Sequence, residues 1–104
     1  MYTFVAVAPH TGGGVMTGHS YDISEGGVQF ELDYPIVPGT PVSIEIKLPG
    51  PGEQAIAAYG NIVWMDDSEP GPVRMAMTFS GFAHERDRER LLEQVMGRGA
   101  RKAA

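Results

Sequence analysis

The 104-residue sequence contains no cysteine. This absence excludes a disulfide framework, thiol chemistry and a zinc–thiolate site, and it fits a reducing compartment. No apolar run approaches the roughly 20 residues that a membrane-spanning helix needs. The first residues, Met1 to Phe4, lack the basic charge that opens a signal peptide. We therefore expect a cytoplasmic protein that does not insert directly into a membrane.

Cationic side chains are also scarce. Eight Lys and Arg residues stand against 13 Asp and Glu residues, which gives a net charge of −5. This balance disfavours a broad basic face for phosphate backbones, so we expect no DNA or RNA partner. The length fits one domain, and a hydrophobic content of 42% is normal for a globular chain and too high for disorder.

Six short segments have the composition and period of β-strands. The clearest is Val42 to Leu48, in which apolar and polar residues alternate strictly. Turn-forming Gly and Pro residues separate the segments, a pattern that predicts a small antiparallel barrel or sandwich. A barrel is favoured because it leaves no exposed strand edge. The expected strands are Tyr2–Ala8, Val15–Asp22, Val28–Asp33, Val42–Leu48, Ala55–Met65 and Val73–Ser80.

A single helix is expected after the strands, from His84 to Met96. Its apolar residues recur at helical spacing and form one face, which most simply plugs an open barrel mouth or packs on a sheet. Gly97 is expected to end the helix and residues 98–104 to form a disordered tail, so the domain covers residues 1–97. The apolar face consists of Leu91, Leu92, Val95 and Met96.

The segment Asp22-Ile23-Ser24-Glu25-Gly26-Gly27 has the pattern D-x-S-x-x-G and lies between the second and third expected strands. The Asp22 carboxylate can accept two hydrogen bonds from the edge of a guanine base. The Ser24 hydroxyl can bond a ligand or its own loop, and Gly27 permits a positive φ or a close ligand approach. The same residues also suit an ordinary turn. Taken alone, the segment is compatible with both readings.

No other part of the sequence offers competing chemistry. His10, His19 and His84 lack metal-ligand spacing, although His19 could line the loop near Asp22. Ser24 has no nucleophile-elbow context. The Thr11–Gly14 segment lacks the Lys-Ser/Thr of a phosphate-binding loop and is expected to be a hairpin turn. We therefore expect no metal site, no catalytic residues and no enzymatic activity.

Two further features have alternative interpretations. Trp64 belongs to the core or the barrel rim, whereas an exposed Trp64 would indicate base stacking or a partner surface. Arg86, Arg88 and Arg90 alternate with acidic residues and suit a solvated helix face. The alternative is that one of these arginines binds an anionic ligand.

The order of these features resembles the PilZ domain family over roughly residues 2 to 96. The D-x-S-x-x-G segment is the family's signature, and a strand after a Pro-Gly turn follows it. The later matches are a hydrophobic strand ending in Trp, a strand resembling Gly-x-x-Phe, and a C-terminal helix with paired leucines. In this sequence the strand after the Pro-Gly turn is Val37–Ile44. The three later matches are Ile62-Val63-Trp64, Ala76-Met77-Thr78-Phe79 and Leu91-Leu92.

The resemblance implies a six-stranded antiparallel barrel with a C-terminal helix, and binding of the bacterial messenger cyclic di-GMP. It places the ligand-binding residues at Asp22, Ser24 and Gly27. The family's second motif, R-x-x-x-R before the first strand, does not occur in the given sequence, whose first arginine is Arg74. It lies upstream of Met1 or does not exist.

The expected function is therefore that of a non-catalytic regulatory or adaptor domain in bacterial signalling, which binds cyclic di-GMP and needs no cofactor. A protein partner is also expected. The alternative is a degenerate PilZ-like module that contacts a protein and does not bind the nucleotide, which the missing R-x-x-x-R motif favours.

Overall fold

The computed structural model describes residues 2–49 and 54–103, with the side chains of the C-terminal helix described as far as Val95. Within these residues, six antiparallel strands form a closed barrel with the strand order β1-β2-β3-β6-β5-β4, and one helix follows them. The predicted fold is thus confirmed. The elements are β1 (Thr3–Pro9), β2 (Met16–Ile23), β3 (Gly27–Leu32), β4 (Pro41–Leu48), β5 (Gln54–Asp66), β6 (Val73–Phe82) and α1 (Glu85–Ala103).

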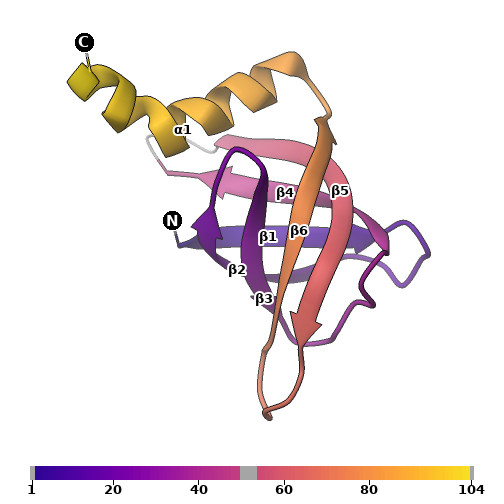
Figure 1. The fold of residues 1–104 in the computed structure, drawn as a ribbon. Helices are drawn as coiled ribbons and strands as arrows, with labels where there is room; N and C mark the ends of the chain where they lie inside the picture. The colour runs from indigo at the N-terminus through magenta and orange to yellow at the C-terminus, as the bar shows by residue number, and fades with distance from the viewer. Residues whose placement is uncertain (1, 50–53, 104) are drawn as a thin grey trace.

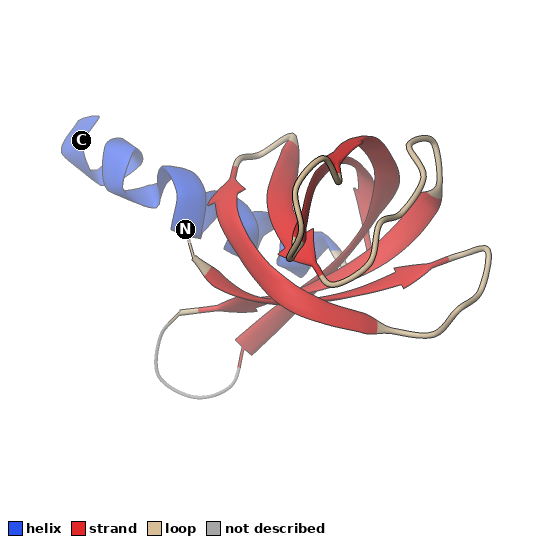
Figure 2. Cartoon of the chain, turned by 90° about the horizontal axis from the view of Figure 1, so that it is seen from below, coloured by secondary structure: helices blue, strands red, loops and turns tan. Residues whose placement is uncertain are grey.

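Two pairings between strands far apart in the sequence close the barrel. β1 pairs with β4, with Val5 opposite Ile46, and β3 pairs with β6, with Phe30 opposite Met75. In Figure 1 the strands enclose a common interior, with α1 across one end and the β5–β6 connection at the other. Figure 2 shows from a perpendicular direction how the strands wrap around that interior.

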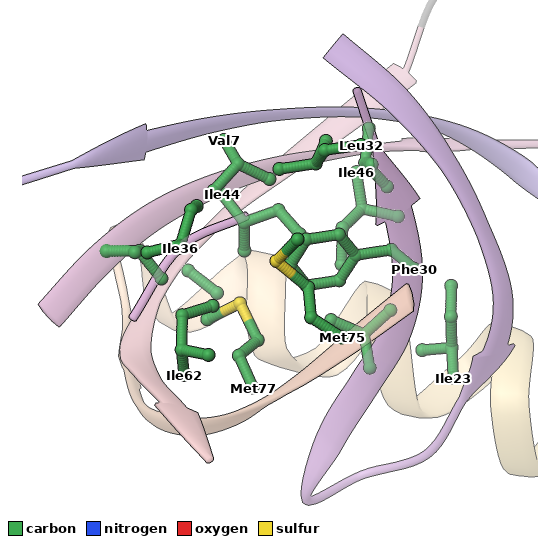
Figure 3. Packing of buried hydrophobic residues seen from close by; sticks show 14 of the residues in the cluster. Val7, Ile23, Phe30, Leu32, Ile36, Ile44, Ile46, Ile62, Met75 and Met77 are labelled. Atoms are coloured by element: carbon green, nitrogen blue, oxygen red, sulfur yellow. The ribbon is translucent and has the colours of Figure 1, made fainter. Parts of the chain in front are cut away.

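The interior is filled by apolar side chains from every strand. Strict alternation along β3 and β4 turns one side of each strand inward, which buries Phe30 completely. In Figure 3, Phe30 lies beside Met75 at the centre of this cluster. The packed core leaves the outer surface as the place for a ligand. Other core residues include Val7, Ile23, Leu32, Ile36, Ile44, Ile46, Ile62 and Met77.

Gly27 and Gly60 are among the glycines that let neighbouring strands approach closely. A Cβ added to Gly27 would collide with the Met77 carbonyl oxygen of β6, and one added to Gly60 would collide with the Thr78 carbonyl oxygen. Neither glycine has a positive φ. The glycine that ends the D-x-S-x-x-G segment is therefore required by the β3–β6 contact, for a reason other than the positive φ considered from the sequence.

Helix α1 is attached to the barrel by both apolar and polar contacts. Leu91 is fully buried in the core cluster, and the Asp87 carboxylate, only 6% exposed, accepts a hydrogen bond of 3.1 Å from the Ala57 amide of β5. The Ala57 carbonyl in turn accepts a 2.9 Å bond from the Ala83 amide. The helix thus covers one end of the barrel beside β5 and β6, as the apolar face predicted.

The helix differs from the sequence prediction at its C-terminal end. Its backbone continues through Gly97 to Ala103, so the prediction that Gly97 ends the helix is wrong. A glycine in the last turns of a helix costs only about 1 kcal/mol relative to alanine, and flanking helix formers offset that cost. The domain boundary at residue 97 and the disorder of residues 98–104 stay predictions. The described helix is not long and apolar enough to cross a membrane.

Candidate ligand-binding site

A β-bulge in β2 turns two consecutive side chains to the outside of the barrel. Ser20 pairs with Phe30 and Asp22 pairs with Gln29, so Tyr21 is the extra residue. Two residues on a bulged strand face one residue on the partner strand, which changes the direction of the side chains. The bulge follows the buried Ser20 and leaves Asp22 exposed.

A second bulge lies in β5 at the same level of the barrel. Ile62 pairs with Met77 and Trp64 pairs with Ala76, so Val63 is the extra residue. Both Val63 and Trp64 are exposed as a result, at 46% and 40% respectively. Trp64 therefore lies on the outer face of the barrel and is not a core residue. Its role in base stacking or partner binding, expected for an exposed Trp64, stays a prediction.

The Gln29–Ala76 pair of β3 and β6 lies between the two bulges. Together they form a row across four strands, Asp22–Gln29–Ala76–Trp64, on the outside of the barrel. A hollow of about 320 Å³ lies along this row, bounded by the Ser24–Gly27 turn and Thr78, with Val63 at its β5 side. Ala76 is only 6% exposed and forms part of its floor.

The three residues predicted from the signature, Asp22, Ser24 and Gly27, all line this hollow. The structure thus brings them together on one surface, and their role in binding stays a prediction. The Asp22 carboxylate is exposed at its edge. Within the described part of the chain it has no hydrogen-bond or ion-pair partner. Its acceptor capacity is available to a ligand.

Ser24 is already engaged in its own loop. Its amide donates a 2.9 Å hydrogen bond to the Gly27 carbonyl, and its hydroxyl oxygen accepts a 3.3 Å bond from the Gly26 amide. The Gly26 carbonyl accepts a 2.9 Å bond from the Phe79 amide of β6. The turn interpretation is therefore correct for this serine, and the turn is fixed to the barrel wall.

Arg74 lies on the same outer face of β6 as Ala76, two residues away, and lines a separate hollow with Glu31, Asp66 and Glu69. Arg74 pairs with Glu31 of β3 on one side and with Asp66 of β5 on the other. Its guanidinium carbon lies 5.4 Å from the centre of the Tyr21 ring. Burial raises the pKa of Tyr21 above its ordinary value, while the Arg74 charge acts in the opposite direction and Glu31 adds to the rise.

Arg86, Arg88 and Arg90 of α1 do not line the hollow. Arg88 lines a neighbouring hollow on the far side of the Ser24–Gly27 turn, together with Glu25 and Glu85. Arg86 and Arg90 line a third hollow beside His84 and Asp87. The hypothesis that one of the three binds an anionic ligand stays a prediction.

The remaining sequence features have structural roles. The Thr11–Gly14 segment forms the predicted turn, in which Gly12, Gly13 and Gly14 all have positive φ. His10 shares a 2.7 Å hydrogen bond with Ser43, and His19 pairs with Glu31 outside the hollow, so the idea that His19 lines it is wrong. The described residues contain no group of three or more potential metal ligands.

An exposed aromatic patch, formed by Tyr2, Phe4 and His19, covers the outside of β1 and β2. Tyr2 is 71% exposed and its ring stacks on His19 at a centroid distance of 5.0 Å. Phe4, 45% exposed, contacts the edge of the same imidazole at 6.2 Å. Large exposed apolar surfaces of this kind are typical of interaction sites.

Sequence reasoning missed the lining residues contributed by β5 and β6. A bulge does not disturb a period of two enough to be recognised, so the outward position of Val63 could not be read from the pattern. A signal existed for Arg74, which shares its strand face with Ala76 through the alternation of β6.

These observations define a class of small closed β-barrels whose packed interior leaves the outer wall as the candidate site. The chain belongs to the PilZ domain family, whose model matches residues 2–97. A search of curated proteins finds no match.

Solved PilZ-type structures share this fold. The inhibitor of motility MotI/DgrA of Bacillus subtilis has a TM-score of 0.79 at 21% identity, and the alignment covers 100% of this chain and 50% of that protein. This chain thus spans half the length of MotI. The PilZ domain of CeSA from a cellulose-synthesizing bacterium has a TM-score of 0.68 at 21% identity, with coverage of 95% and 94%. The PilZ domain of YcgR from Escherichia coli, solved with c-di-GMP, has a TM-score of 0.60 at 17% identity, with coverage of 98% and 86%.

Proposed function

We propose that this domain is a non-catalytic receptor for cyclic di-GMP in bacterial signalling. The observation that carries the proposal is the exposed Asp22 carboxylate without a partner, at the edge of an outer hollow formed by the family's signature loop. The PilZ domain of YcgR was solved with the same nucleotide. Family membership over residues 2–97 supports a regulatory role of this kind.

The chemistry of the hollow suits a guanine base. The Asp22 carboxylate would accept hydrogen bonds from the guanine N1–H and its exocyclic amine. Trp64, exposed beside Ala76, offers an aromatic face on which a base can stack, worth roughly 1–3 kcal/mol. Ser24 and Gly27 would act mainly by holding the turn and the β3–β6 wall in place.

Titration calorimetry with cyclic di-GMP tests the proposal. Asp22→Ala removes both acceptors, so we expect the affinity to fall by about one to two orders of magnitude. Asp33→Ala removes an equally exposed carboxylate just after β3 and is the matched control. The proposal fails if the unmodified chain gives no binding heat, or if both variants bind as tightly as it does.

A second function, contact with a protein partner, is favoured by the aromatic patch of Tyr2, Phe4 and His19. As an adaptor, the domain would use this patch, whose residues Tyr2, Phe4 and His19 do not line the hollow at Asp22. Replacing Tyr2 and Phe4 by serine should abolish capture of a partner from a bacterial lysate. Cyclic di-GMP affinity should stay unchanged. A partner that the double variant still captures would exclude this patch.

A further inference from the structure

Among the described residues, no positively charged side chain that could attract an anionic ligand lines the hollow at Asp22. Cyclic di-GMP carries two phosphate charges, and the hollow itself is lined by a carboxylate and by no Lys or Arg. Charged phosphate oxygens bind proteins most strongly through arginine, which donates two parallel hydrogen bonds. A ligand held there would gain greatly from a cation within reach of the hollow.

The barrel strands provide two cationic residues, Lys47 and Arg74. Lys47 lies on β4 and lines a hollow with Phe4 and Gln54, on the side of the barrel formed by β1, β4 and β5. Arg74 lies on β6, two residues from Ala76 and on the same outer face. Two residues of a strand span about 6.6 Å, which the long arginine side chain can cross.

Arg74 is held loosely enough to change partner. Glu31 and Asp66 flank it in register. Glu69 lines the same outer hollow as these two carboxylates and Arg74, and the Arg74 charge contributes to a lowered pKa of Asp66. Among the described residues, however, the guanidinium forms no ion pair, and its carbon lies 5.4 Å from the centre of the Tyr21 ring. Tyr21 is the bulged residue directly before Asp22. A cation on an exposed ring is worth about 0.5–1 kcal/mol, less than a charge-assisted bond to phosphate.

We infer that Arg74 is a phosphate-binding residue of this site, moving from the Tyr21 ring to the ligand when the hollow is occupied. This inference rests on the proposed cyclic di-GMP function and extends its site to a residue outside the D-x-S-x-x-G segment. It also gives the β2 bulge a second role, because the extra residue Tyr21 holds the guanidinium beside the hollow in the free protein.

Arg88 is the natural comparison. It too lies near the signature loop and shares a hollow with carboxylates, Glu25 and Glu85, but it lies on the other side of the Ser24–Gly27 turn. Removing either arginine changes the net charge by the same amount. Arg88→Ala therefore controls for the general loss of attraction between an acidic protein and an anionic ligand.

The test is calorimetric titration of cyclic di-GMP into the unmodified chain, Arg74→Ala, Arg74→Lys and Arg88→Ala. We expect Arg74→Ala to weaken binding about tenfold to a hundredfold, Arg74→Lys to recover part of that loss, and Arg88→Ala to bind within about twofold of the unmodified chain. Denaturation curves of the variants confirm that each is folded. In NMR spectra, the ring signals of Tyr21 should shift on ligand addition as the guanidinium leaves them.

The outcomes separate the inference from the function beneath it. If Asp22→Ala abolishes binding while Arg74→Ala binds normally, Arg74 has no role and the receptor function stands. Equal losses for Arg74→Ala and Arg88→Ala would show a general charge effect and overturn the inference. If the unmodified chain does not bind cyclic di-GMP, the proposed function fails and the inference fails with it.

Discussion

Gly27, the last residue of the D-x-S-x-x-G segment, is required by the packing of two barrel strands. Its lack of a side chain lets the β3 backbone approach the Met77 carbonyl of β6. A Cβ added to the adjacent Gly26 would meet no neighbouring atom, and the Gly26 carbonyl oxygen accepts a hydrogen bond from the Phe79 amide. Two neighbouring glycines in one loop thus have different steric requirements.

Gly27→Ala should destabilise the fold, because the new Cβ would force β3 and β6 apart. Overpacking of this kind costs about 1–3 kcal/mol in the free energy of unfolding. Gly26→Ala, the matched control, should stay within about 0.5 kcal/mol of the unmodified chain. Urea denaturation measures both values. Equal stability of the two variants would show that the β3–β6 wall yields without cost.

The ionisation of Tyr21 makes the free energy of unfolding depend on pH in the alkaline range. Burial raises the pKa of Tyr21 above its ordinary value of 10.0, despite the opposing Arg74 charge. The folded chain therefore holds the phenol proton more tightly than the unfolded chain. This contribution is complete below the ordinary value and is lost as pH rises through the raised pKa.

Denaturation curves between about pH 9 and 11 test this dependence. The unmodified chain should lose stability more steeply than Tyr21→Phe over that interval. Arg74→Ala should raise the pKa of Tyr21 further, because it removes the cation that stabilises tyrosinate. The titration of tyrosinate absorbance, taken as a difference from Tyr21→Phe, reports that pKa. A lower pKa in Arg74→Ala would contradict the assignment.

At the scale of elements, period-of-two alternation predicted three of the six strands, and composition with flanking turn residues predicted the other three. Val42–Leu48, for example, is observed as β4, which begins one residue earlier at Pro41. The two bulges that form the candidate site left no such signal, because each changes the pattern by one residue only. Sequence alone therefore located Asp22 and Ser24, and it missed Val63 and the link to Arg74.

The Asp87 carboxylate provides the polar part of the attachment of α1, beside the apolar packing of Leu91. Asp87→Ala would leave the Ala57 amide without its acceptor, at a cost of about 1–3 kcal/mol in the free energy of unfolding. Asp87→Asn retains an acceptor oxygen and should lose less. Hydrogen exchange of the Ala57 amide should accelerate in the alanine variant first. Unchanged exchange in that variant would exclude the proposed attachment.

For the whole molecule, the sequence predicted a barrel because six strands with turns between them would otherwise leave exposed edges. The pairs that close it, β1 with β4 and β3 with β6, were not predicted, because the period of a strand does not specify its partner. The end of α1 could not be predicted, because a glycine near a helix terminus changes the free energy of helix formation by only about 1 kcal/mol.

Truncation tests the predicted domain boundary. A chain ending at Gly97 should keep the unfolding free energy of the full chain, since Asp87 and Leu91 are the buried side chains in the part of α1 described to Val95. A chain ending at His84 loses both and should be less stable by several kcal/mol, as expected for removal of a buried leucine and a buried acceptor. Marked destabilisation by the first truncation would move the boundary toward residue 104.

The closure of the barrel also determines when during synthesis the hollow can exist. Its walls come from β2 and β3 near the start of the chain and from β5 and β6 near the end. A nascent chain that has not yet released Phe82 from the ribosome has Asp22 and Ser24 but no opposing wall. The complete hollow can therefore form only after almost the whole domain has emerged.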